Sequence, residues 1–150
     1  MEQRQEIKLR DNFTEHVRGL YTAKLNLDLK VLRQTADEMY DIIKDTFVPD
    51  NSDYNGQSTL TTQLYSKYNF LMYPLPGIHD LYWNIHHVFH ECLTHLHGGR
   101  VNRRHFMQCW LNYYQKGQFI DWHSHTPRDV GAWHGFFCLY VEPGSYTSYR

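Results

Sequence analysis

Two histidines separated by one residue are the feature of this sequence most suggestive of chemistry. His123 and His125 lie in the segment Asp121-Trp122-His123-Ser124-His125. Alternate side chains of an extended segment project to the same side, so both imidazoles could reach one metal ion. Imidazole suits iron, zinc, copper and nickel, and the pair alone does not select among them. The alternative interpretation is a pair of solvated histidines beside a turn.

Other members of the set of 11 histidines are also candidates for metal binding. His86 and His90 are four residues apart in a predicted helix and share one face, a spacing that can chelate zinc. The zinc-protease patterns H-E-x-x-H and H-x-x-E-H are absent, and we interpret the pair as the flank of a packed helix, with a zinc site as the alternative. His134 either lies near His123 and His125, across a short loop, or is an ordinary sheet histidine.

The elements that must position these residues begin with two amphipathic helices. Apolar residues at steps of three and four predict a helix over residues 27–46, with Asp28 as its N-cap or first-turn acid. The same pattern predicts a second helix over 79–97, which Gly98 ends. Residues 13–25 are expected to form a short strand or a lead-in that contains a turn.

The hydrophobic period changes to two after the second helix. The segment 105–114 is expected to place on one face Met107, Cys109, Leu111 and Tyr113, and on the other Phe106, Gln108, Trp110, Asn112 and Tyr114. Aromatic side chains on both faces predict a central, covered strand, and further short strands follow it. The order indicates one α+β domain, helical over about 1–100 and β-rich over about 104–150, with a sheet or partial barrel in the second part.

Composition and charge narrow the function classes. A net charge of −1 without a basic patch does not favour nucleic acid as a partner. The three cysteines form no C-x-x-C pair, which argues against a disulfide scaffold and favours a reducing, cytoplasmic setting. The polar N-terminus does not resemble a signal peptide, and no apolar run approaches the roughly 20 residues of a membrane span.

From about residue 106 onward the chain resembles the iron(II)/2-oxoglutarate-dependent oxygenase superfamily. The residues that carry the resemblance are Tyr114, Gly117, His123 and the position of His125, at the spacing found in prolyl-hydroxylase-like members. The longer run W-L-N-Y-Y-Q-K-G-Q-F-I-D-W-H-S-H, followed by W-H-G-F-F-C-L-Y-V-E-P-G-S-Y-T-S-Y-R, is similar to small oxygenases encoded by T4-like cyanophages. A phage-encoded enzyme would act in the cytoplasm of its host cell.

The resemblance implies a fold, a reaction and site residues. The fold would be a double-stranded β-helix, a jelly-roll of the cupin-like kind, with N-terminal helices packed on its major sheet. The cofactors would be iron(II) and 2-oxoglutarate, with ascorbate as reductant, and dioxygen would oxidise a C–H bond of a protein side chain or small molecule. His123 would be the first iron ligand and Tyr114 would hydrogen-bond 2-oxoglutarate; Asn112 and Gln108, on the same face by alternation, would help to line its pocket.

This sequence departs from the family pattern at two places. His125 stands where an Asp is usual, and either replaces that carboxylate as a ligand or is a bystander. His134 is the only histidine after it, and the family's last histidine, a basic residue beyond it and the closing strands are not found. We therefore expect either a truncated chain or a barrel assembled from two copies in a homodimer, because an open sheet edge favours association. The alternative function is a non-catalytic metal-binding or structural protein that retains part of the oxygenase fold.

Overall fold

The computed structural model describes residues 13–17, 20–47, 64–98, 104–114, 116–120 and 133–145. Its elements, in chain order, are strands β1 (Phe13–Val17) and β2 (Leu20–Ala23), helix α1 (Leu29–Thr46), the 3₁₀ turn η2 (Phe70–Met72) and helix α3 (Ile78–His97). The described part of the chain is therefore α+β, as the sequence predicts, while the jelly-roll stays a prediction. Within the same ranges, no helix is long and apolar enough to cross a membrane.

Helix α1 begins and ends close to the predicted bounds. Asp28 is its N-cap, and its carboxylate accepts hydrogen bonds from the backbone N–H groups of Lys30 at 3.0 Å and Val31 at 3.1 Å. These bonds satisfy donors that the first turn of a helix leaves without a partner. The helix buries one stripe of residues, consisting of Leu32, Thr35, Ala36, Met39 and Ile43.

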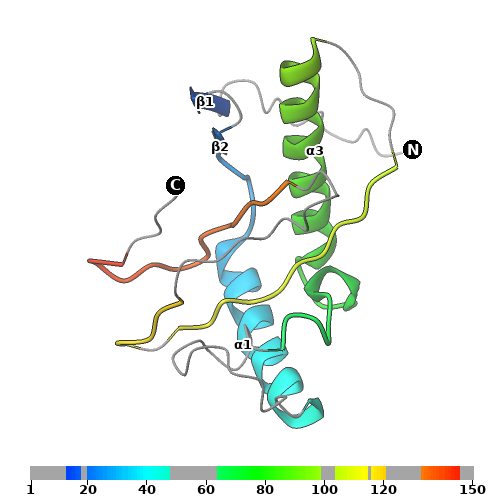
Figure 1. Cartoon of the computed structure of the whole chain (residues 1–150). Helices are drawn as coiled ribbons and strands as arrows, with labels where there is room; N and C mark the ends of the chain where they lie inside the picture. Colours follow the sequence, from blue (N-terminus) through cyan, green and yellow to red (C-terminus); the bar gives the residue numbers. More distant parts are fainter. Residues whose placement is uncertain are drawn as a thin grey trace.

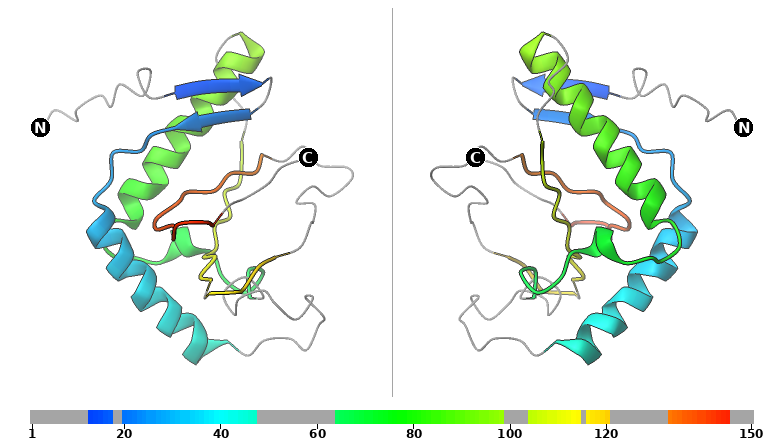
Figure 2. Two further views of the ribbon diagram at one scale, coloured as in Figure 1. Left: turned by 90° about the vertical axis from the view of Figure 1, so that its left-hand side faces the viewer. Right: turned by 90° about the vertical axis from the view of Figure 1, so that its right-hand side faces the viewer.

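Helix α3 starts where it meets α1. Gly77 precedes it with a φ of +77°, and a Cβ at this glycine would stand 3.0 Å from Leu32 Cδ2 of α1. The Thr35 hydroxyl donates a 2.7 Å hydrogen bond to the carbonyl of Pro76 at the same junction. The two helices consequently form a V whose apex lies near this contact (Figure 2). Gly98 ends α3 in the left-handed conformation, as its position in the sequence predicts.

The predicted lead-in is an antiparallel β-hairpin of β1 and β2, with a register shift between Glu15 and Val17. Phe13 and Tyr21 stack across the hairpin with ring centroids 5.1 Å apart. Both rings meet the imidazole of His95 edge-on, at 6.2 and 5.9 Å. These contacts place the hairpin against the C-terminal half of α3 (Figure 1).

The main hydrophobic core lies near the apex of the V. It is formed by buried residues of α1, of the segment 64–72 and of the first turns of α3: Leu32, Met39, Ile43, Leu64, Tyr68, Phe70, Ile78 and Leu81. Residues from two later segments, 104–114 and 133–145, pack against it: Cys109, Trp110, Leu111, Phe137 and Leu139. Figure 2 shows the helices on one side of the molecule and these two segments on the other.

Segment 104–114 differs from the predicted strand. No strand is assigned to any described residue between 104 and 145. The physical reason is that its backbone hydrogen-bonds to residues 68–70 and not to the ladder of a neighbouring strand. Phe70 N–H donates to the carbonyl of Cys109 at 2.8 Å, and Leu111 N–H donates to the phenol oxygen of Tyr68 at 2.8 Å.

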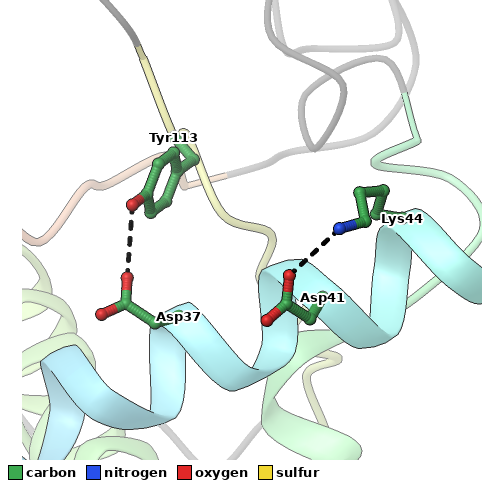
Figure 3. Close-up of polar contacts among 4 residues, drawn as sticks. All are labelled: Asp37, Asp41, Lys44 and Tyr113. Atoms are coloured by element: carbon green, nitrogen blue, oxygen red, sulfur yellow. Dashed lines mark hydrogen bonds and ion pairs between the residues drawn. The ribbon is translucent and has the colours of Figure 1, made fainter.

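The predicted alternation of faces is present only in part, since Trp110, expected on the outer face, is partly buried against the core. Met107, Cys109 and Leu111 are partly buried, whereas Gln108 and Asn112 are exposed. Tyr113 lies on the helix side: its ring stacks on Tyr40, and its hydroxyl donates a 3.3 Å hydrogen bond to Asp37 of α1 (Figure 3). The segment therefore has an inner side, toward the helices, and an outer side.

Segment 133–145 shows the same alternation. Phe137 and Leu139 are partly buried against the core, while His134, Phe136 and Cys138 are exposed. Both segments pack on the core, and we call five of their exposed residues the outer face: Gln108, Asn112, Tyr114, His134 and Phe136.

Candidate functional site

The site residues predicted from the sequence fall into two groups. Gln108, Asn112, Tyr114 and His134 are described, and all four are exposed on the outer face. The two predicted iron ligands, His123 and His125, lie outside the described residues. The structure thus leaves all four described members of the predicted site exposed.

Two observations bear on the local geometry of the outer face. The rings of His134 and of Trp110, which packs against the core, lie 6.2 Å apart, a contact between segment 133–145 and segment 104–114. Gly117 has a φ of +85°, so the glycine of the Y-x-x-G spacing makes a turn in a conformation that L side chains rarely adopt. This turn follows Tyr114 directly and precedes the histidine pair in sequence.

The side-chain amide of Gln108 has a partner within the protein. Its Nε2 donates a 3.0 Å hydrogen bond to the carbonyl of Tyr65, whose ring lies 5.6 Å from that of Trp110. The donor end of Gln108 therefore contributes to holding segment 104–114 beside residues 64–67. This hydrogen bond is made within the protein, whereas the sequence predicts that Gln108 contacts 2-oxoglutarate.

A second candidate site lies where α3 meets the start of segment 104–114. His86 and His90 project from adjacent turns of α3, and His105 approaches them from the other segment. The potential ligand atoms of the three histidines all lie within 4.8 Å of one another. Their ring centroids are 4.4 Å apart for His86 and His90, 5.3 Å for His86 and His105, and 5.2 Å for His90 and His105.

The sequence indicated only part of this cluster. The spacing of His86 and His90 identified a shared helix face, and we interpreted that face as packing. His105 was not among the predicted ligands, because its proximity depends on the path of the chain after α3. The alternative interpretation of the helix pair, a metal site, now has a third imidazole to support it.

The surroundings of the three histidines are aromatic. The ring of Phe89 lies 4.8 Å from that of His105 and 5.8 Å from that of His90, and Trp83 lies 5.3 Å from His86. Burial lowers the pKa of His86, and the neighbouring histidines lower it further. Its Nδ1 atom is buried and makes no hydrogen bond. A neutral imidazole in this setting is in the form that binds a metal ion.

Comparison of the chain with protein-family models, with curated proteins and with solved structures finds no match. A functional proposal therefore depends on the residues and contacts described above.

Proposed function

We propose that this chain forms part of an iron(II)- and 2-oxoglutarate-dependent oxygenase that hydroxylates a C–H bond of its substrate. The observation that carries the proposal is the sequence spacing of Tyr114, Gly117 and His123, with His125 two residues further on. It is supported by the exposure of Gln108, Asn112, Tyr114 and His134 in segments that pack on the helices. The resemblance implies helices behind a sheet and the cosubstrate in front of it.

The motif residues supply the donor set for such a site. His123 and His125 would hold the iron ion, His125 taking the position of the usual carboxylate, and His134 offers a third imidazole on the outer face. Imidazole is a good ligand for iron(II). When bound, the iron and 2-oxoglutarate supply the oxidising chemistry: 2-oxoglutarate, dioxygen and a C–H group yield succinate, carbon dioxide and an alcohol.

The described residues would bind and orient the cosubstrate. The phenol of Tyr114 is a hydrogen-bond donor, and in this proposal it donates to a carboxylate of 2-oxoglutarate, with the Asn112 amide as a second donor. A hydrogen bond to an ionised group is stronger than one between neutral groups. The exposed ring of Phe136 beside His134 would help to exclude water from the reacting groups.

The test is turnover of 2-oxoglutarate to succinate by the full chain with iron(II) and ascorbate, followed by mass spectrometry. We expect His123→Ala to abolish turnover, and Tyr114→Phe to raise the KM for 2-oxoglutarate about tenfold with a smaller effect on kcat, as expected for loss of one bond to a charged group. Tyr113→Phe is the matched control, because Tyr113 binds Asp37 on the helix side and should leave the KM unchanged.

Two results would contradict the proposal. Turnover that survives His123→Ala would place the chemistry elsewhere. Iron binding without any consumption of 2-oxoglutarate would favour the alternative function, a non-catalytic metal-binding protein that retains part of the fold.

A further inference from the structure

The three histidines between α3 and segment 104–114 are distinct from the proposed iron ligands. We propose that His86, His90 and His105 form a second metal site that binds zinc and ties α3 to segment 104–114. This site does not depend on the oxygenase proposal, because it shares no residue with His123, His125 or His134.

The geometry needs little adjustment to hold an ion. His86 and His90 are related by one helical turn, so their rings face the same direction, and their centroids are 4.4 Å apart. All potential ligand atoms lie within 4.8 Å of one another. Nitrogens bound to a tetrahedral zinc ion at about 2.0–2.1 Å are separated by roughly 3.4 Å, a distance that small rotations of exposed or half-buried rings can reach.

The donor set selects the class of metal. Three imidazoles without a carboxylate suit zinc and its neighbours in the transition series and do not suit calcium or magnesium, which prefer oxygen ligands. Three protein ligands leave a fourth position for water, as in zinc sites that are open on one side. Burial, and then the neighbouring histidines, lower the pKa of His86, which favours the neutral form that binds a metal ion.

The ion would join α3 to the start of segment 104–114. The ring of Phe89 on α3 lies 4.8 Å from that of His105, and the backbone of the segment is bonded further along, at Cys109 and Leu111, to residues 68–70. A metal bound at His105 would fix the end of the segment that precedes Gln108 and Tyr114. Because the metal ion would bind the folded chain and not the unfolded one, it must also raise the stability of the folded chain.

The experiment is a titration of the full chain with zinc by calorimetry, and with cobalt(II) by visible absorption, whose d–d bands report a four-coordinate site. Mutation of a residue that only supports a metal ligand typically lowers metal affinity about 10–100-fold. Loss of a ligand itself, in His90→Ala or His105→Ala, should therefore weaken zinc binding at least about 100-fold. His87→Ala is the matched control: His87 is exposed, lies on the same helix and is outside the cluster. It should bind zinc as tightly as the original chain.

Two further measurements keep the proposal open to refutation. Zinc should raise the Tm of the original chain and of His87→Ala, but not of His105→Ala or His105→Gln; circular dichroism verifies that each variant is folded. The double variant His123→Ala/His125→Ala should retain this zinc affinity. The proposal is overturned if zinc binding survives His105→Ala and His105→Gln, if His87→Ala weakens it equally, or if only the double variant abolishes it.

Discussion

The side chain of Asn69 holds the backbone at Cys109 as a neighbouring strand would. Its Oδ1 accepts a hydrogen bond from Cys109 N–H at 3.1 Å, and its Nδ2 donates one to the carbonyl of Met107 at 2.8 Å. The same oxygen also accepts from Leu71 N–H at 3.2 Å. One amide therefore satisfies the backbone on both sides of Gln108 and fixes which residues of the segment face outward.

Replacing Asn69 should destabilise the fold more than an exposed asparagine does. Asn69→Ala removes three hydrogen bonds and leaves partly buried backbone groups without partners, and we expect a loss of about 2–3 kcal/mol in the free energy of unfolding. Asn26→Ala, at an exposed position between β2 and α1, should change it by less than about 0.5 kcal/mol. Equilibrium urea denaturation measures both, and equal midpoints for the two variants would contradict the role of Asn69.

A pair of glycine substitutions separates backbone strain from the contact between the helices. Gly77 and Gly98 both have positive φ, but only at Gly77 would a Cβ meet a neighbour, Leu32 Cδ2 at 3.0 Å. Gly98→Ala should cost about 1–2 kcal/mol from the left-handed conformation alone. Gly77→Ala should cost about 1–3 kcal/mol more, because the added methyl group crowds α1. Thermal unfolding measures the stability of both variants. A smaller loss of stability for Gly77→Ala than for Gly98→Ala would contradict the prediction, because it would show that α1 shifts easily to accommodate the added methyl group.

Tyr68 should make stability dependent on alkaline pH. Its hydroxyl accepts from Leu111 N–H, and burial raises its pKa above the ordinary value of 10.0. Above about pH 10 the unfolded chain loses this proton and the folded chain keeps it, so the folded state becomes less stable as pH rises, by up to about 1.4 kcal/mol per pH unit. Below pH 10 this contribution is fully present.

The matched variant is Tyr68→Phe, which removes the titrating group. It should be less stable by about 1 kcal/mol at neutral pH, since it loses one hydrogen bond. Its stability should fall less steeply than that of the original chain between about pH 9 and 11. Urea midpoints across this range test the difference, and parallel pH profiles would argue that Tyr68 ionises in the folded state as it does in the unfolded one.

The local signals in the sequence predicted the helices well. Asp28 and Gly98 mark ends that depend only on nearby backbone groups, and α1 and α3 start or end within two residues of the predicted bounds. The partial burial of Met107, Cys109 and Leu111 was also predictable from the hydrophobic period, whereas that of Trp110 was not.

Features that depend on the path of the chain were not predictable in this way. No pattern in the sequence indicates that the Asn69 amide takes the place of a strand partner, so the expected strand at 105–114 was wrong in its hydrogen bonding. His105 was missed for the same reason, since only the return of the chain along α3 brings it to His86. Tyr114 and His134 are exposed, and their roles stay predictions.

The bonds that hold segment 104–114 also have a consequence for the order of folding. They join residues 38 to 43 positions apart, from Asn69 with Met107 to Tyr68 with Leu111. Closing such loops costs chain entropy before any contact compensates for it, whereas α1 and α3 form from neighbours in sequence. We therefore expect the helices to form first and the layer that carries Tyr114 to dock later on the surface they provide.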